Sequence, residues 1–330
     1  MNRIFITGNC GFLGSHISEA LIHEGYEVAG NDTLICGSPD NAKCEWHNVD
    51  CCNFDGMKTI LDKFHPDVLV HTAALAHEGL STFSPSYITK SIFGASVATF
   101  SAAISSGVER IVNLSSMSRY GAGSPPFTEE HPTAPVDCYG IAKVAAEDAL
   151  KNLCKTHGVK WSILVPHNVI GIRQRSIDPA RNVAAIMINR CKQGKPPIIY
   201  GDGMQMRCFS PVKDCLPSIV KAVHGDGDGE VVNIGPDHSS MTINELAVQI
   251  MNLTNFEGEP IYVPGRPNEV KDAYCSSDKA RRLLGFSVKQ SLMDCLKEMV
   301  DYIKPEPFLY DFPIEIVTER TPKTWTEKQI

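Results

Sequence analysis

Three residues of this sequence have side chains suited to moving a hydroxyl proton. Tyr139 and Lys143 lie in the segment Y-G-I-A-K, and Ser116 lies in L-S-S-M-S. Side chains four residues apart on a helix share one face, so Tyr139 and Lys143 are expected to be neighbours. A tyrosine has a pKa of about 10, and a neighbouring ammonium favours its phenolate, which can then act as a base. Ser116 ends a predicted strand, where a parallel sheet opens into its ligand crevice.

A glycine-rich turn lies near the N-terminus, in T-G-N-C-G-F-L-G. It directly follows a predicted strand and opens a predicted helix, which is the context that a dinucleotide cradle requires. Gly8 permits the tight turn, Gly11 lets the backbone approach a pyrophosphate, and Gly14 lets the helix pack closely on the strand. The helix N-terminus, with Phe12 and Leu13, offers free N–H groups to the phosphates. The alternative is that these glycines serve a tight turn only.

Two acidic residues end the next strands. Asp32 comes eighteen residues after Gly14, where a carboxylate accepts hydrogen bonds from the adenosine ribose and repels a 2′-phosphate. No Arg or Lys follows until Lys43, so the sequence favours NAD over NADP. Asp50, with Cys51 beside it, is placed to meet the adenine, although a turn at the surface is the alternative for this aspartate.

The elements that must position these residues alternate between strand and helix. This rhythm predicts an α/β fold, a Rossmann-type doubly wound parallel sheet with helices on both faces. The runs VLVHTAA and RIVNLSS lack strict alternation, as expected for strands buried on both sides. The expected strands are Arg3–Thr7, Glu27–Asn31, Cys44–Asp50, Asp67–Ala73, Arg110–Ser115 and Trp161–His167, and the expected helices are Leu13–His23, Asn53–Phe64, Tyr87–Ser106 and Tyr139–His157.

Beyond about residue 170, Gly and Pro become frequent and the rhythm loosens. We expect a cofactor domain over residues 1–170, a smaller C-terminal α/β substrate lobe over 171–303 with segments that return to the first domain, and a tail over 304–330. The tail is Pro-rich and is expected to wrap the surface or to stay mobile. The expected helices of the lobe are Asn182–Gln193, Ile243–Asn252, Ser277–Leu284 and Leu292–Ile303.

The composition is that of an ordinary globular chain. Of its 330 residues, 43% are hydrophobic and 21% charged, and its net charge of −7 with no basic block argues against a nucleic-acid partner. Its 12 cysteines include no C-x-x-C pair, so we expect free thiols and no metal site. The uncharged stretch Ser91–Val108 is rich in Ser and has helical spacing, which favours a packed helix over a membrane span. The N-terminus does not read as a signal peptide, so a cytoplasmic protein is expected.

The motifs together resemble a known family. TGNCGFLGSH, HTAALAH, LSSMSRYG, YGIAK, PHNVIG, IYGDGMQMRCF and GRPNEV are similar to segments of the extended short-chain dehydrogenases/reductases, in the nucleotide-sugar epimerase/dehydratase family. The resemblance spans roughly residues 1–303 and is nearest to the UDP-glucose (UDP-galactose) 4-epimerase type. It implies a nucleotide-sugar substrate and a homodimer, in which the helix Ser91–Ser106 and the helix that begins at Tyr139 form a four-helix bundle.

The resemblance also implies a role for each matching residue. Tyr139 takes the proton of the sugar 4-hydroxyl, Lys143 binds the nicotinamide ribose, and Ser116 hydrogen-bonds the same sugar oxygen. Two arginines, the residue type suited to bidentate phosphate contacts, are expected at the diphosphate. The diphosphate ligands are Asn168, Arg207 and Arg266, the nucleoside ribose ligand is Glu269, the further cofactor contacts are Thr72, Ala73, Ala74 and Pro166, and the further substrate contacts are Ser118 and Asn182.

Several positions depart from the family pattern. Ser91 stands where an Asn is usual, Glu269 where an Asp is usual, Val165 where an Arg is frequent and Ile170 where a Tyr is frequent. These differences bear on fine contacts with cofactor and substrate and leave the expected fold unchanged.

The expected reaction is 4-epimerisation through a 4-keto sugar, with the redox step carried by NAD. Sugar 4,6-dehydratases place an Asp-Glu pair after the strand-end Ser or Thr, whereas this chain has Met117 and Ser118, which do not exchange a proton near neutral pH as carboxyls do. A 4-oxidase and a uronate epimerase or decarboxylase remain alternatives, the last because Arg175 lies where uronate-handling relatives place an arginine; a surface arginine is the other interpretation.

Two further expectations concern catalysis and the size of the sugar. A non-catalytic NAD sensor is disfavoured because Ser116, Tyr139 and Lys143 are all present. In the 4-epimerases that this chain resembles, the residue seven positions after the phosphate-binding arginine lies beside the sugar 2-substituent, where a small side chain admits an N-acetyl group. The resemblance implies this role for Ala273, seven positions after Arg266; a shift of one position would bring Tyr274 there instead.

Overall fold

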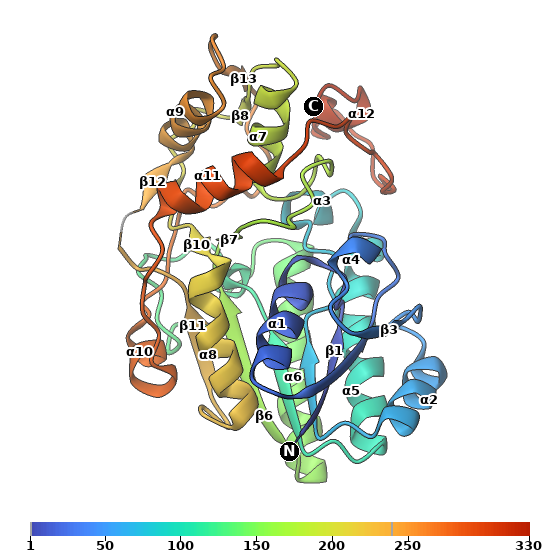
Figure 1. Cartoon of the computed structure of the whole chain (residues 1–330). Helices are drawn as coiled ribbons and strands as arrows, with labels where there is room; N and C mark the ends of the chain where they lie inside the picture. The colour runs from blue at the N-terminus through green and yellow to red at the C-terminus, as the bar shows by residue number, and fades with distance from the viewer. Residues whose placement is uncertain (1, 239) are drawn as a thin grey trace.

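A parallel sheet of seven strands forms the centre of the larger lobe (Figure 1). The computed structural model describes residues 2–238 and 240–330. The strand order is β3-β2-β1-β4-β5-β6-β11, so the chain winds outward from β1 in both directions, and the predicted doubly wound Rossmann-type fold is confirmed. The strands are β1 (Arg3–Thr7), β2 (Glu27–Asn31), β3 (Glu45–His47), β4 (Val68–His71), β5 (Arg110–Leu114), β6 (Lys160–Pro166) and β11 (Val231–Ile234).

Helices cover both faces of this sheet, which is why its central strands are buried along their whole length. The apolar side chains of α1 (Phe12–His23), α8 (Val212–His224) and α10 (Asp278–Leu284) pack on one face. Those of α2 (Phe54–Phe64), α5 (Ala95–Ser105) and α6 (Cys138–His157) pack on the other. The sheet thus presents the carboxyl ends of its strands, and the helix N-termini beside them, to one edge.

The uncharged stretch forms one continuous helical run, α4 (Pro85–Thr89), a turn of π-helix η2 (Lys90–Gly94) and α5. By length and composition alone, Pro85–Ser105 could cross a membrane, and 44% of its apolar window is buried inside the protein. It packs against α2 and α6. The side chains of Phe93 and Ile141 remain exposed on this side of the molecule.

The smaller lobe lies beyond the carboxyl edge of the sheet (Figure 1). Three helices share its core: α7 (Val183–Lys192), α9 (Ile243–Leu253) and α11 (Leu292–Tyr302). Short strands complete it: β7 (Val169–Ile170) with β10 (Ser210–Pro211), β8 (Ile198–Tyr200) with β13 (Ile261–Val263), and β9 (Met206–Arg207) between β12 (Met241–Thr242) and β14 (Asp272–Ala273).

Segments after residue 170 do return to the large lobe. Strand β11 pairs with β6, and α8 packs against α1. Neither element was among those expected from the sequence: α8 carries Pro217 in its interior, and β11 lies among glycines. The predicted strand Cys44–Asp50 is shorter than expected, because only Glu45–His47 pairs with β2.

The tail, residues 304–330, is packed rather than free, and we call it the C-terminal strap. Its Glu315 carboxylate accepts hydrogen bonds from the backbone N–H groups of Ser86 and Tyr87 at 2.9 and 2.8 Å, which caps α4. Its Trp325, on α12 (Lys323–Thr326), is buried and donates from Nε1 to the carbonyl oxygen of Pro179 at 3.3 Å. The strap therefore joins the large lobe to the segment that leads into α7.

Candidate active site

A single cavity of about 600 Å³ lies between the carboxyl edge of the sheet and the smaller lobe. It brings together every predicted site residue except Arg175. Its walls include the predicted cofactor residues Gly8, Gly11, Phe12, Leu13, Asp32, Asp50, Cys51, Thr72, Ala73, Ala74 and Pro166, the predicted catalytic residues Ser116, Tyr139 and Lys143, and the predicted substrate residues Ser118, Asn168, Asn182, Arg207, Arg266, Glu269 and Ala273.

The glycine turn at one end of the cavity is as tight as its sequence predicts. Gly8 has a φ of +68°, and a Cβ on Gly14 would lie 2.1 Å from the carbonyl oxygen of Gly8. No side chain caps the N-terminus of α1, and its first turn carries no acidic residue. The backbone N–H groups and the helix dipole are therefore available to an anionic pyrophosphate, and the residues present fit a dinucleotide.

Asp32 lies beside this turn. Its Oδ2 accepts a hydrogen bond from the N–H of Cys10 at 3.0 Å, and its Oδ1 accepts one from the N–H of Leu34 at 2.7 Å. Burial raises its pKa, and these backbone N–H groups oppose that rise. The carboxylate both orders the loop after β2 and lines the cavity, where it can accept from a ribose hydroxyl.

Tyr139 and Lys143 share one face of α6, and Asp137 caps this helix by accepting from the N–H of Gly140 at 2.7 Å. The Lys143 ammonium lies 5.9 Å from the centre of the Tyr139 ring and donates to the carbonyl oxygen of Leu114 at 2.9 Å. Burial raises the pKa of Tyr139 to about 12, while Ser116 acts to lower it. Burial lowers the pKa of Lys143 to about 8, so this side chain stays largely protonated at neutral pH and favours the phenolate.

A buried ion pair anchors α6 next to the end of β5. Arg119 and Glu147 lie 2.9 Å apart with side chains only 5% and 1% exposed, and Ser115 donates to the same carboxylate. Glu147 also raises the pKa of Lys143, against the effect of burial. The pair thus fixes the orientation of the helix that carries the predicted base.

The two arginines of the cavity wall are positioned by contacts with the protein. Arg207 donates to the carbonyl oxygens of Met206, Lys271 and Val270, so its place depends on the short strands β9 and β14. Arg266 stacks on the ring of Tyr200 and lies 2.9 Å from Glu269. Its buried Nε has no hydrogen-bond partner among the described residues. Two guanidinium groups on one cavity wall suit a diphosphate.

The structure bears on two predicted contacts, Arg175 and Ala273, and on two departures from the family pattern. Arg175 does not line the cavity, because its guanidinium donates to the carbonyl oxygen of Ile35 and pairs with Asp311 of the strap. Ala273 does line the cavity, and Tyr274 does not. Val165 and Ile170, in β6 and β7, have no exposed surface and pack within the hydrophobic core.

Glu78 and Arg181 are among the charged residues that line the cavity although the sequence did not single them out. Glu78 begins the short helix α3 (Glu78–Ser81), and Arg181 precedes α7. Their electrostatic effect reaches Tyr139, whose pKa Glu78 raises and Arg181 lowers. Neither belongs to a recognisable spacing pattern: the only signal was that each adjoins a residue of a family segment or a predicted contact.

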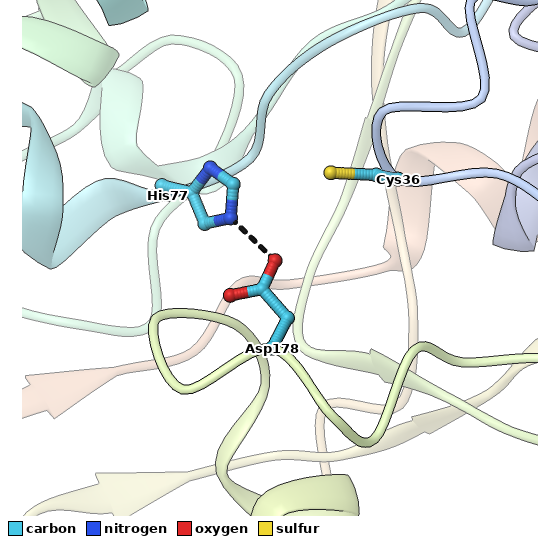
Figure 2. Close-up of side chains that lie close together, drawn as sticks. All are labelled: Cys36, His77 and Asp178. Carbon is cyan, nitrogen blue, oxygen red and sulfur yellow. Dashed lines mark hydrogen bonds and ion pairs between the residues drawn. The ribbon is translucent and has the colours of Figure 1, made fainter. Parts of the chain in front are cut away.

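His77, which directly precedes Glu78, forms a compact group with Cys36 and Asp178 (Figure 2). His77 Nε2 and Asp178 Oδ2 lie 2.7 Å apart, and the potential ligand atoms of all three residues lie within 4.8 Å of one another. Zinc would hold two such nitrogen and oxygen ligands about 3.3 Å apart, given bonds of about 2.0 Å and tetrahedral angles. The 2.7 Å between His77 and Asp178 is thus too short for two ligands of one zinc ion and fits a direct hydrogen bond, with the Cys36 thiol nearby.

The sheet order, the glycine turn and the grouping of Ser116, Tyr139 and Lys143 define a dinucleotide-binding protein of the short-chain dehydrogenase/reductase class. The family model of the NAD dependent epimerase/dehydratase family matches residues 4–235. The chain belongs to this family, and its cofactor is NAD, which several similar solved structures contain.

Known proteins similar to this chain act on different sugars. A UDP-glucose 4-epimerase of Thermotoga maritima, solved with UDP-glucose, is 31% identical with a TM-score of 0.86, over 91% of this chain and 98% of that one. A UDP-N-acetylglucosamine 4-epimerase of Methanobrevibacter ruminantium, solved with UDP-N-acetylmuramic acid, is 27% identical with a TM-score of 0.83, over 91% and 97%. A UDP-glucuronate 4-epimerase of Thermodesulfobacterium geofontis is 26% identical over 92% and 97%.

Proposed function

We propose that this protein is an NAD-dependent 4-epimerase of a nucleotide-activated sugar. One observation carries the proposal: the proton-transfer group of Ser116, Tyr139 and Lys143 and the two arginines suited to a diphosphate line the same cavity as the glycine turn. A dinucleotide and a nucleoside diphosphate sugar can thus meet in one enclosed space.

In the proposed mechanism, different residues transfer the proton, bind the sugar oxygen and hold the diphosphate. Tyr139 accepts the proton of the sugar 4-hydroxyl, and Ser116 donates a hydrogen bond to the same oxygen. Lys143, fixed by the carbonyl oxygen of Leu114, favours the phenolate by its charge. When bound, NAD supplies acceptance and return of hydride at C4. Arg207 and Arg266 hold the diphosphate, which leaves the sugar free to present either face.

The residues after Ser116 support epimerisation over 4,6-dehydration. Met117 and Ser118 begin a single turn, η3 (Met117–Arg119), in which Ser116 Oγ accepts from the N–H of Ser118 at 3.2 Å. Neither side chain can deliver a proton to a leaving hydroxyl as a carboxylic acid does. The position of Arg175 outside the cavity gives no support to a uronate ligand at that residue.

The sugar is best tested through Ala273. Because Ala273 lines the cavity and Tyr274 does not, we propose that an N-acetylhexosamine is accepted at least as well as the plain hexose. The first measurement incubates the NAD-loaded protein with UDP-, GDP-, CDP- and dTDP-sugars and follows the products by NMR. Bound NAD without conversion of any of these sugars would favour the sensor interpretation.

The second measurement compares kcat/KM for UDP-glucose and UDP-N-acetylglucosamine. Ala273→Tyr should suppress the acetamido sugar selectively, since its ring would fill the space beside the 2-substituent. A preference of the unmodified protein for the plain hexose above about tenfold, worth some 1.4 kcal/mol of transition-state binding, would contradict the proposal.

A further inference from the structure

The cavity wall beside Tyr139 carries a carboxylate that the proposed mechanism does not use. Glu78 lines the cavity at the start of α3 and is exposed to it. Within residues 2–238 and 240–330, its side chain makes no hydrogen bond or ion pair. Its charge acts on Tyr139, and also on Arg207 and Arg266. The next residue, Gly79, lies against the guanidinium of Arg266, since a Cβ built on it would be 3.0 Å from Nη1. A sugar bound between Tyr139 and the arginines would therefore pass close to this turn.

Arg181 lines the same cavity from the smaller lobe. Its Nη1 is buried and has no hydrogen-bond partner in the described part of the chain. An unpartnered buried donor is costly unless a ligand satisfies it. Its charge also helps to lower the pKa of the Asp178 carboxylate, which lies 2.7 Å from His77. Arg181 thus offers an unsatisfied donor to a sugar oxygen.

A buried clamp fixes the two residues relative to each other. His77 directly precedes Glu78, and its Nε2 lies 2.7 Å from Asp178, which accepts from the N–H of Ala180 just before Arg181 (Figure 2). Both clamp side chains are only 3% exposed. The strap adds a second tie, since Trp325 bonds the carbonyl of Pro179 and its ring lies 3.5 Å from a Cβ built on Gly79. The contacts of His77, Asp178 and Trp325 therefore fix the backbone at Glu78 and Arg181.

Two carboxylates line the cavity beside Tyr139. Glu78 has no ion-pair partner among the described residues, and Asp137, the cap of α6, adds a second carboxylate. The cations that line the cavity are Arg181, Lys90, Lys143, Arg207 and Arg266; in the proposed mechanism Lys143 meets the cofactor ribose, and Arg207 and Arg266 meet the diphosphate. A carboxylate on the substrate would meet repulsion here, whereas hydroxyl and amide N–H groups would find an acceptor.

We propose that Glu78 and Arg181 form a recognition subsite for the sugar ring, in which Glu78 accepts hydrogen bonds from the sugar and excludes uronic acids. The inference rests on the proposed epimerase function and narrows its substrate class to uncharged sugars. Glu78 thereby acts as a specificity-determining residue, and the His77–Asp178 pair acts as its positioning device.

The decisive variant is Glu78→Gln, which keeps the size and acceptor oxygen of the side chain and removes its charge. We expect the native protein to prefer UDP-glucose over UDP-glucuronate by at least about tenfold in kcat/KM, and Glu78→Gln to reduce this ratio about tenfold by raising turnover of the uronate. The acid limb of the pH–rate profile should also move to lower pH, because a charge that raises the pKa of Tyr139 is lost. Glu24→Gln, an exposed position at the end of α1, serves as the matched control.

The variant Arg181→Gln distinguishes this proposal from the alternative in which Arg181 binds the carboxylate of a uronate. We expect it to lower kcat/KM for UDP-glucose by about tenfold through loss of a hydrogen-bond donor. If Arg181→Gln instead abolished only the turnover of UDP-glucuronate, Arg181 would be a carboxylate ligand and the proposal would be wrong. A native preference for the uronate, or a ratio unchanged in Glu78→Gln, would overturn it as well.

A binding measurement keeps this test independent of the reaction. NAD-loaded Tyr139→Phe protein is titrated calorimetrically with UDP-glucose and with UDP-glucuronate, with and without Glu78→Gln. The subsite is supported if UDP-glucose binds more tightly than UDP-glucuronate and if Glu78→Gln reduces this difference in affinity. This result would support the subsite even if no epimerisation is found and the proposed function fails. Equal affinity for both sugars contradicts the subsite, even if the protein proves to be an epimerase.

Discussion

The Tyr139 side chain combines deep burial with a chemical task. It is 6% exposed, and burial raises its pKa to about 12, while the hydrogen bond with Ser116 and the charge of Arg181 lower this pKa. We expect Tyr139→Phe to remove nearly all turnover, because it deletes the proton acceptor and little volume. The measurement is steady-state turnover together with the NAD content of the purified variant. A variant that keeps most of its rate would show that this hydroxyl is not the base.

Asp32 sets the cofactor preference in our interpretation. We expect the purified protein to carry NAD, or to bind it in preference to NADP, because the carboxylate repels a 2′-phosphate. Asp32→Ala should narrow the difference in affinity between the two cofactors, which fluorescence titration of the reduced forms can measure. Because the variant also loses bonds to the N–H groups of Cys10 and Leu34, both affinities should fall. Tighter binding of NADP by the native protein would overturn the assignment.

How far the sequence predicts single residues depends on whether they belong to a pattern. The glycines, Ser116, Tyr139 and Lys143 have fixed spacings on one strand or helix, and the structure brings them to one cavity. Arg175 was predicted from position alone, and the salt bridge to Asp311, more than a hundred residues away, draws it elsewhere. Glu78 and Arg181 have no pattern of their own, since only the tertiary clamp brings them together.

At the scale of the element, the cap of α6 has a pH-dependent consequence. Burial, and next the charge of Glu78, raise the pKa of Asp137 from 3.8 to about 6. Between these values the folded protein holds the proton more tightly than the unfolded chain does, so stability falls as the pH rises through this window. Asparagine is an equally good cap and has no charge to bury.

We therefore expect the melting temperature of Asp137→Asn, measured relative to that of the native protein, to increase as the pH is raised from about 4 to about 7. The measurement is thermal unfolding at a series of pH values. Asp226→Asn, an exposed position in the turn after α8, should show no such trend. A difference for Asp137→Asn that is constant across this range would contradict the explanation.

Elements were predictable where local signals agreed with the tertiary environment. The 20-residue helix α6 has a side-chain cap at Asp137 and ends at Gly158 in a left-handed conformation, and its predicted bounds were right to within one residue. Helix α8 was missed because Pro217 argues against a helix interior, yet the packing of its apolar face in the core overrides this preference. The strap was expected to wrap the surface or to stay mobile, and its buried anchor, Trp325, lies far along the chain from the carbonyl that it bonds.

At the scale of the whole molecule, two exposed apolar side chains lie on helices that pack together. Phe93 is 41% exposed on η2, and Ile141 is 53% exposed on α6. We expect these surfaces to meet their copies in a homodimer, since a four-helix bundle would cover them.

The measurement is the molar mass in solution at micromolar concentration, by size exclusion with light scattering. Combining Phe93→Glu with Ile141→Lys should give a monomer, because charges would have to be buried at the interface. Val317→Glu, which changes an exposed apolar residue of the strap, should leave the dimer intact. A native protein that is monomeric would contradict the expectation.

The position of β11 has a consequence for how the protein is made. Strand β6 contributes Ile163, Leu164 and Val165, all with no exposed surface, and one of its edges is paired only by β11. During synthesis, the residues after β6 up to Ile234 must leave the ribosome before that edge can be covered. A nascent chain that ends between these points therefore displays an unpaired apolar strand, the kind of edge that recruits other chains. Protection by chaperones should matter most in this interval, and a fragment cut at residue 170 should aggregate rather than fold as a free nucleotide-binding unit.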